Sequence, residues 1–316
     1  MPFSFRPAPK GPSQQPTTET LATVLAAVRG LYVEPGRLVT DVLAGGFRST
    51  FRGGGVEFSD VREYVEGDDP RAVDWNVTAR FGRPFVKRFV EERERTLVFV
   101  FDLQPTMACG FGAWSLRQAA ARLCACLGLM AIENHDRVGL LMGNAGRLRM
   151  VLPKKGAGHV LRIVRDCVEA PCRGDASSVD AMLAHVAGRL RRRAVVFVLS
   201  DFAGHAPLPS LVGCAKHHDV VAVRLLANEL RTPPHTLLRA HDPVSGRSVM
   251  VDFAATAVRT AWQQRVQNWL GLRHEQFQRA GVDCMDIEVP AVADLAAISG
   301  PLARFFRRRS LRQVRR

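Results

Sequence analysis

Short apolar stretches that alternate with helical patterns constrain the fold of this chain more than any other feature. Five of them have the length and composition of buried strands: TLVFVFD at 96–102, RVGLLMG at 137–143, AVVFVLSD at 194–201, HDVVAVRLL at 218–226 and VDCMDIEV at 282–289. Helical patterns separate them, at 114–134, 158–168, 178–193, 209–217 and 254–280. The alternation predicts an α/β fold of Rossmann type, with a mostly parallel sheet that helices cover on both faces.

Composition divides the rest of the chain. Residues 1–18 are rich in Pro, Ser, Thr and Gln, which predicts a flexible leader. Residues 19–95 are expected to form a helix followed by a charged, β-rich segment of short strands and turns. We expect the α/β domain to span 96–303, with a β-hairpin at about 235–253, and a basic tail to occupy 304–316.

The sequence lacks the patterns of a secreted, zinc-binding or membrane-spanning protein. The N-terminal segment contains no apolar core of a signal peptide, and no stretch approaches 18 uncharged apolar residues. Seven cysteines without a repeated C-x-x-C pair argue against a disulfide framework and a zinc site. We therefore expect a cytoplasmic protein whose thiols are reduced and buried.

Two of the predicted strands end in carboxylates, Asp102 and Asp201. Ligands of open parallel sheets bind outside the carboxyl ends of the strands, so both acids should lie at the ligand-binding edge. Thr106 offers a hydroxyl shortly after Asp102, and Ser177 or Ser178 offers another at the start of a predicted helix. Oxygen ligands of this kind suit Mg²⁺ or Mn²⁺. The alternative is that both acids only cap loops and helix starts.

Positive charge is concentrated at the carboxyl end of the sequence. The formal net charge is +14, and residues 304–316 contain no acid and seven arginines: Arg304, Arg307, Arg308, Arg309, Arg312, Arg315 and Arg316. Such a tail would be attracted to the phosphates of nucleic acid or to an anionic membrane surface. The alternative is a solvated terminal segment with no dedicated ligand.

The acid-ended strands resemble those of the von Willebrand factor A domain. In that domain a D-x-S-x-S loop, a Thr on a second loop and an Asp on a third form a metal-ion-dependent adhesion site. By resemblance, Asp102 matches the first acid and Thr106 the second hydroxyl of its loop. Ser177 is the candidate on the second loop, Asp201 matches the third-loop acid, and Gln104 stands where the first Ser is expected. The resemblance implies a protein-binding domain with a degenerate site for Mg²⁺ or Mn²⁺.

A long charged motif covers Gly55–Arg80. It reads G-x-E-F-x-D-x-R-E-Y-x-x-G-D-D-x-R-x-x-D-W-x-x-T-A-R, and DRVGL follows at 136–140 and LSDF at 199–202. Together these segments resemble the bacterial domain-of-unknown-function-58 family, whose members are similar to von Willebrand factor A proteins and are associated with MoxR-type AAA ATPases. The resemblance implies a non-enzymatic adaptor that binds a MoxR-type AAA ATPase and a client complex.

Within this motif, acids and arginines are interleaved with two aromatic residues. The members that we single out are Asp60, Arg62, Tyr64, Asp68, Asp69, Arg71, Asp74, Trp75 and Arg80. Arginine forks paired with carboxylates would form either an internal scaffold or a polar surface for a partner. A further alternative, a metal-dependent hydrolase, would use Asp68, Asp69 and Asp74. Because no nucleophile elbow or phosphate-binding loop accompanies these acids, we expect the chain not to be an enzyme.

Overall fold

The computed structural model of this 316-residue chain describes residues 4–5, 21–26, 57–90, 94–110, 112–144, 147–172, 178–204 and 207–314. The chain divides into two compact units, a larger one of residues 1–50 and 96–316 and a smaller one of residues 51–95. The expected segment 19–95 is therefore split between the two units. Residues 21–26 are helical and belong to the larger unit, and their Val24 is fully buried.

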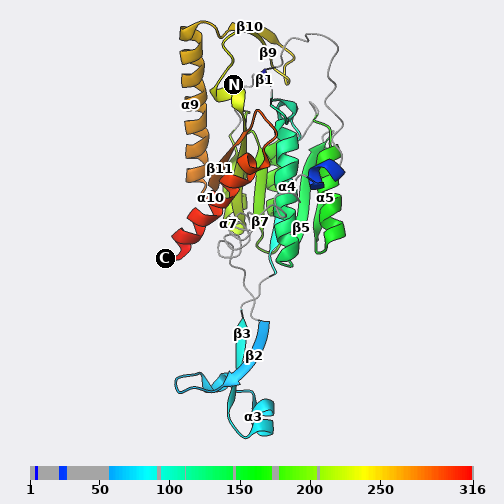
Figure 1. Cartoon of the computed structure of the whole chain (residues 1–316), viewed down its shortest axis with the longest axis vertical. Coiled ribbons are helices and arrows are strands. Elements are labelled where there is room, and N and C mark those ends of the chain that lie inside the picture. The colour runs from blue at the N-terminus through cyan, green and yellow to red at the C-terminus, as the bar shows by residue number, and fades with distance from the viewer. Residues whose placement is uncertain are drawn as a thin grey trace. The chain divides into compact units, whose positions relative to one another are not determined.

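Among the described residues, a six-stranded sheet forms the centre of the larger unit (Figure 1). Its strands are β4 (Thr96–Phe101), β5 (Arg137–Asn144), β6 (Arg147–Lys154), β7 (Val195–Ser200), β8 (Asp219–Ala227) and β11 (Asp283–Val289). Their order in space is β11-β8-β7-β4-β5-β6, and all pairs are parallel except the hairpin of β5 and β6. Numbered along the chain this is 3-2-1-4-5-6, the order of a doubly wound sheet. The predicted α/β class is confirmed.

The central strands are apolar throughout because both faces of the sheet are covered. Every residue of β7 is buried, and in β4 only Thr96 is partly exposed. Side chains alternate along a strand, so Val98 and Val100 contribute to the core on one face while Phe99 lies on the other. The rings of Phe99 and Phe197, which are register partners in β4 and β7, have centroids 6.2 Å apart.

Helices of two groups cover the two faces. Helices α4 (Leu116–Glu133), α5 (Ala157–Glu169) and α10 (Leu295–Val314) lie over one face (Figure 1). The core of the other face is formed with α6 (Val179–Arg189), α7 (Pro209–His217) and the last turn of α9 (Thr256–Arg279). Helix α4 begins with a capping box, in which the backbone N–H of Gln118 donates to Ser115 Oγ at 3.3 Å and that of Ser115 donates to Gln118 Oε1 at 2.8 Å.

The predicted hairpin residues form β9 (Leu237–His241) and β10 (Ser248–Asp252), which pair antiparallel. A short strand β1 (Ser4–Phe5) pairs with the free edge of β9, so these two residues are ordered where the sequence predicted a flexible leader. The hairpin has a small core of its own, in which Phe253 and Trp262 meet edge to face at 5.5 Å. Trp262 Nε1 donates to the carbonyl of Leu230 in α8 (Asn228–Arg231) at 2.9 Å.

The predicted boundary between domain and basic tail, at residue 304, falls inside helix α10. The separate tail is wrong for the described residues, because Phe306 is fully buried and Arg309 forms ion pairs with Asp219 and Asp283. Arg315 and Arg316 lie outside the described residues. None of the helices in the described ranges is long and apolar enough to cross a membrane.

The smaller unit is built on an antiparallel pair, β2 (Glu57–Glu63) and β3 (Phe85–Val90). Between these strands lie a short 3₁₀ helix, η1 (Pro70–Ala72), and helix α3 (Trp75–Phe81). Gly82 adopts the left-handed conformation, with φ of 66°, that commonly ends a helix. The expected charged segment of short strands and turns is thus a folded unit whose described residues, 57–90, include the short helix α3.

Candidate functional site

The winding of the sheet reverses between β4 and β7. The chain leaves β4 for α4 on one face and leaves β7 for α7 on the other. Asp102 follows β4 directly, and Asp201 follows Ser200 at the end of β7. The backbone N–H of Asp102 donates to the carbonyl of Leu199 at 3.1 Å, which joins the two strand ends. Open α/β sheets bind their ligands at such a reversal, outside the carboxyl ends of the strands.

The carboxylate of Asp102 is buried and fixed by two hydrogen bonds. Its Oδ1 accepts from the backbone N–H of Gln104 at 2.9 Å, and its Oδ2 accepts from Ser200 Oγ at 2.6 Å. Ser200 Oγ in turn accepts from the backbone N–H of Phe202 at 2.9 Å. The Asp102 carboxylate is therefore positioned by the backbone of its own loop and by the Ser200 hydroxyl at the end of β7.

Asp201 is the second buried carboxylate at this edge, and its Oδ1 accepts from the backbone N–H of Ala203 at 3.0 Å. The next residue, Phe202, has a positive φ of 50°, which is uncommon for a bulky side chain and indicates local strain. Its ring is buried edge-on against Phe277 of α9, with centroids 5.0 Å apart. This packing holds the turn that carries Asp201.

Burial raises the cost of ionising both Asp102 and Asp201. Burial, and then the charge of Asp201, raise the pKa of Asp102 to about 7. Burial also raises the pKa of Asp201, while the hydroxyl of Thr106 and the charge of Arg273 act in the opposite direction. Two carboxylates that are buried together favour either a retained proton or a nearby cation.

The oxygen atoms at this edge are of the chemical kind that hard divalent cations prefer as ligands. Thr106 lies in a 3₁₀ helix, η2 (Pro105–Ala108). Its buried Oγ1 has no hydrogen-bond partner of ordinary geometry among the described residues, although it is near enough to Asp201 to lower that pKa. The side chain of Gln104 does not cap η2. Among the described residues, no three Asp, Glu, His or Cys side chains gather as a metal site, so a cation here would also need hydroxyl and water oxygens.

The structure thus brings together three of the four predicted metal-site residues: Asp102, Thr106 and Asp201. The fourth, Ser177, lies outside the described residues. Its neighbour Ser178 is the N-cap of α6, where Ser178 Oγ accepts from the backbone N–H of Ala181 at 3.2 Å.

Sequence reasoning missed Arg273 of α9, which lies near Asp201 although 72 positions separate them in the chain. Burial lowers the pKa of Arg273, and the charge of Asp201 acts against that shift. A signal was available, because Arg273 shares the buried stripe of α9 with Trp262, Val266 and Phe277. A buried arginine on an apolar stripe predicts a carboxylate partner nearby.

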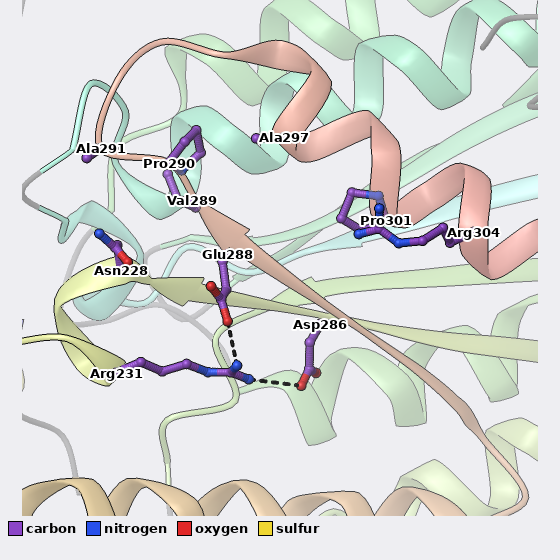
Figure 2. Close-up of a pocket in the computed structure, with 10 residues that line it drawn as sticks. All are labelled: Asn228, Arg231, Asp286, Glu288, Val289, Pro290, Ala291, Ala297, Pro301 and Arg304. Atoms are coloured by element: carbon purple, nitrogen blue, oxygen red, sulfur yellow. Dashed lines mark ion pairs between the residues drawn. The ribbon is translucent and has the colours of Figure 1, made fainter. Parts of the chain in front are cut away.

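A pocket of about 560 Å³ lies at the same edge, where β8 and β11 end (Figure 2). Arg231 of α8 reaches across it to two acids of β11, with Arg231 Nη1 2.6 Å from Glu288 Oε1 and Nη2 3.9 Å from Asp286 Oδ2. Pro290 and Ala291 line the pocket, and the Ala291 carbonyl accepts from the backbone N–H of Ala113 at 3.1 Å. The pocket therefore borders the loop between Asp102 and α4.

In the smaller unit, the predicted charged residues form a local scaffold. Arg62 Nη2 donates to Asp68 Oδ1 at 2.7 Å, Asp68 Oδ2 accepts from the backbone N–H of Val65, and Tyr64 Oη donates to the carbonyl of Asp68 at 3.2 Å. These contacts hold the pKa of Asp68 below its ordinary value, first through the Val65 N–H and then through Arg62. The side chain of Asp60 lies outside the described part of the chain.

The other two acids of the hydrolase hypothesis serve as helix caps. Asp69 caps η1 by accepting from the backbone N–H of Arg71 at 3.0 Å, and Asp74 caps α3 through Asn76 and Val77. By contrast, Trp75 is 73% exposed, and Arg71 and Arg80 are exposed as well. The acids are consistent with the internal scaffold, and Trp75 contributes little to it. Catalysis through Asp68, Asp69 and Asp74 stays a prediction, and it requires phosphoester or peptide turnover that Asp74→Asn abolishes.

Comparisons with known proteins place residues 60–269 in a family described as protein of unknown function DUF58. The chain is 30% identical over 208 residues to the uncharacterized proteins Mb1516 of Mycobacterium bovis and Rv1480 of Mycobacterium tuberculosis. Those matches cover 64% of this chain, and the chain spans 64% of the length of these curated relatives. Among solved structures, it is similar to the SpRpn10 VWA domain, with 13% identity and a TM-score of 0.31 over 66% of this chain and 93% of the other.

Proposed function

Since the chain belongs to the DUF58 family, we propose that it works as a protein-binding adaptor and not as an enzyme. In this proposal the edge of the sheet between β4 and β7 recognises an acidic group on a partner protein. The partner is a MoxR-type AAA ATPase or the client complex on which that ATPase acts, and the ATPase does the nucleotide-driven work. The observation that carries the proposal is the pair of buried carboxylates, Asp102 and Asp201, beside the buried hydroxyl of Thr106.

A Mg²⁺ or Mn²⁺ ion bound here would supply an electrophilic position for a carboxylate oxygen of the partner. Asp102 and Thr106 would hold the ion, with Ser177 as a further candidate outside the described residues. Asp201 would orient a water molecule, and the charge of Arg273 opposes the rise that burial causes in the pKa of Asp201. The Gln104 N–H and the Ser200 hydroxyl fix the Asp102 carboxylate by hydrogen bonds. Its remaining lone pairs could therefore bind a ligand with little further loss of side-chain entropy.

Affinity capture from the native lysate tests this proposal. The tagged chain would be used as bait in Mg²⁺ and in EDTA, beside Asp102→Ala and a matched control, Glu169→Ala, which removes an exposed acid of α5. We expect an AAA ATPase among the captured proteins. The amount captured should fall more than about tenfold in EDTA and for Asp102→Ala, because either change removes the charged group that binds the partner's carboxylate. Capture that survives both chelation and Asp102→Ala, or that Glu169→Ala weakens equally, would contradict the proposal.

A further inference from the structure

Helix α10 has two chemically opposite sides. Leu302 and Phe306 are fully buried on one side, and Arg309 is held there in ion pairs. The other side is exposed and carries arginines at the spacing of one helical stripe: Arg304, Arg307, Arg308 and Arg312. The apolar side of the helix is therefore occupied by the fold, and its free side is a row of guanidinium groups.

A second group of exposed bases lies at the edge of the sheet where α10 ends. These are Arg191, Arg192 and Arg193 before β7, and Lys216 and His217 at the end of α7. The backbone N–H of Asp219, at the start of β8, donates to the carbonyl of Ala194 at 2.8 Å. The carboxylate of Asp219 binds Arg309 of α10. Asp219 thus joins the turn before β7 to the last turns of α10.

The two acids that pair with α10 do not neutralise these bases. Asp219 is engaged by Arg309, and Asp283 is shared between Arg309 at 3.3 Å and Arg312 at 3.7 Å. Within the described part of the chain, Arg192, Arg307 and Arg308 take part in no ion pair. We call the resulting surface the basic face, defined by Arg191, Arg192, Arg193, Lys216, Arg307, Arg308 and Arg312.

We propose that the basic face binds the phosphate backbone of double-stranded nucleic acid without reading its sequence. Six of its seven members are arginines, whose planar forks match phosphate oxygens two at a time. A duplex carries one negative charge per about 1.7 Å of its axis. This charge density matches a dense cluster of guanidinium groups better than the scattered carboxylates of an acidic protein do.

Two observations favour a duplex over a bilayer or a single strand. An interfacial helix needs a free apolar side, but the apolar side of α10 is buried. Among the described side chains of α10, Leu311 is the one large apolar residue that is exposed beside the arginines, which is too little to enter a bilayer. Single strands are bound by stacking bases on aromatic rings, but Phe306 is buried and Phe305 is half-buried against Phe306 and Arg309. The basic face lies at the amino-terminal edge of the parallel strands, opposite Asp102 and Asp201, so it is separate from the partner site proposed above.

Fluorescence anisotropy of a short labelled DNA duplex tests the proposal on the full chain. The variant Arg192→Gln/Arg307→Gln/Arg308→Gln removes three exposed charges from the basic face. The control Arg147→Gln/Arg247→Gln/Arg265→Gln removes three exposed charges elsewhere on the larger unit, so both variants have the same net charge. We expect the first variant to bind the duplex at least about tenfold more weakly, and the control to lose much less affinity. The negative slope of log K against log salt should become less steep by roughly two to three for the first variant, because three phosphate contacts are removed.

A third variant, Arg192→Lys/Arg307→Lys/Arg308→Lys, keeps the charge and should retain most of the affinity, which separates phosphate binding from damage to the fold. Equal losses in the Gln variant and its control would show that only net charge matters, and would overturn the proposal. It would also be overturned if the wild-type chain bound vesicles of phosphatidylglycerol and phosphatidylcholine but not the duplex, or bound a single strand more tightly than the duplex.

Discussion

Asp102→Asn is expected to make the cation-free protein more stable than the wild type at pH 8, and to flatten its stability between pH 4 and pH 7. The pKa of Asp102 is about 7 in the folded chain, raised by burial and by Asp201 above its ordinary value of 3.8. The folded state therefore holds a proton that the unfolded state has already released across this range. This retained proton stabilises the folded state fully below about pH 4. As the pH rises through 7 the stabilisation is lost, and the free energy of unfolding falls by up to about 4 kcal/mol.

Urea denaturation in EDTA at several pH values measures this effect. The wild type should lose free energy of unfolding between pH 4 and pH 7 relative to Asp102→Asn, because asparagine keeps the shape of the side chain without the charge. The exposed control Glu169→Gln should follow the wild type. Parallel pH profiles for the wild type and Asp102→Asn would mean that the carboxylate is ionised at little cost, and that the pair is not strained.

Asp286→Ala should destabilise the larger unit by about 3–5 kcal/mol, because it leaves a buried guanidinium without its carboxylate. Only 3% of the Arg224 side chain is exposed, and its Nε and Nη2 both donate to Asp286 at 2.8 Å. Its Nη1 donates to the carbonyl of Leu270 at 3.1 Å. These bonds join the edge strand β11 and its neighbour β8 to α9, so the loss should be seen as a lower urea midpoint for the whole unit.

Glu288→Ala is the matched control for this prediction. It removes the acid that pairs with Arg231, and both of these side chains are nearly half exposed, so the cost should stay below about 1 kcal/mol. The double variant Arg224→Met/Asp286→Ala should recover part of the lost stability, because a buried apolar pair avoids the uncompensated charge. Equal losses for Asp286→Ala and Glu288→Ala would show that Arg224 finds another partner or water.

The central sheet was predictable because each buried strand of this fold is a short apolar run, and a helical pattern follows most of them. The acids at the ends of β4 and β7 were predictable for a related reason, since parallel strands bring their carboxyl ends to one edge. Helix α10 was not predictable, because the many arginines of its exposed side dominate the composition of residues 304–316. That composition is the same as that of a solvated tail, although Leu302 and Phe306 are buried on the other side of the helix.

Contacts between distant segments limited the prediction of the site. Ser200 is an ordinary strand residue in sequence, but its hydroxyl fixes Asp102, 98 positions earlier in the chain. Arg273 approaches Asp201 only because α9 packs its last turns, with Phe277, against Phe202. In the charged motif at residues 55–80, the sequence predicted that arginines pair with carboxylates. It did not predict that Asp69 and Asp74 cap helices or that Trp75 is exposed.

The most direct measurement is a titration of the purified chain with Mn²⁺ at pH 8, followed by the electron paramagnetic resonance signal of free Mn²⁺. If Asp102, Thr106 and Asp201 hold a cation, the wild type and Glu169→Gln should each bind one ion per chain, and Asp201→Asn should bind it at least about tenfold more weakly. Absence of binding by the wild type at millimolar Mn²⁺, or equal binding by Asp201→Asn, would contradict a cation site at the reversal of the sheet.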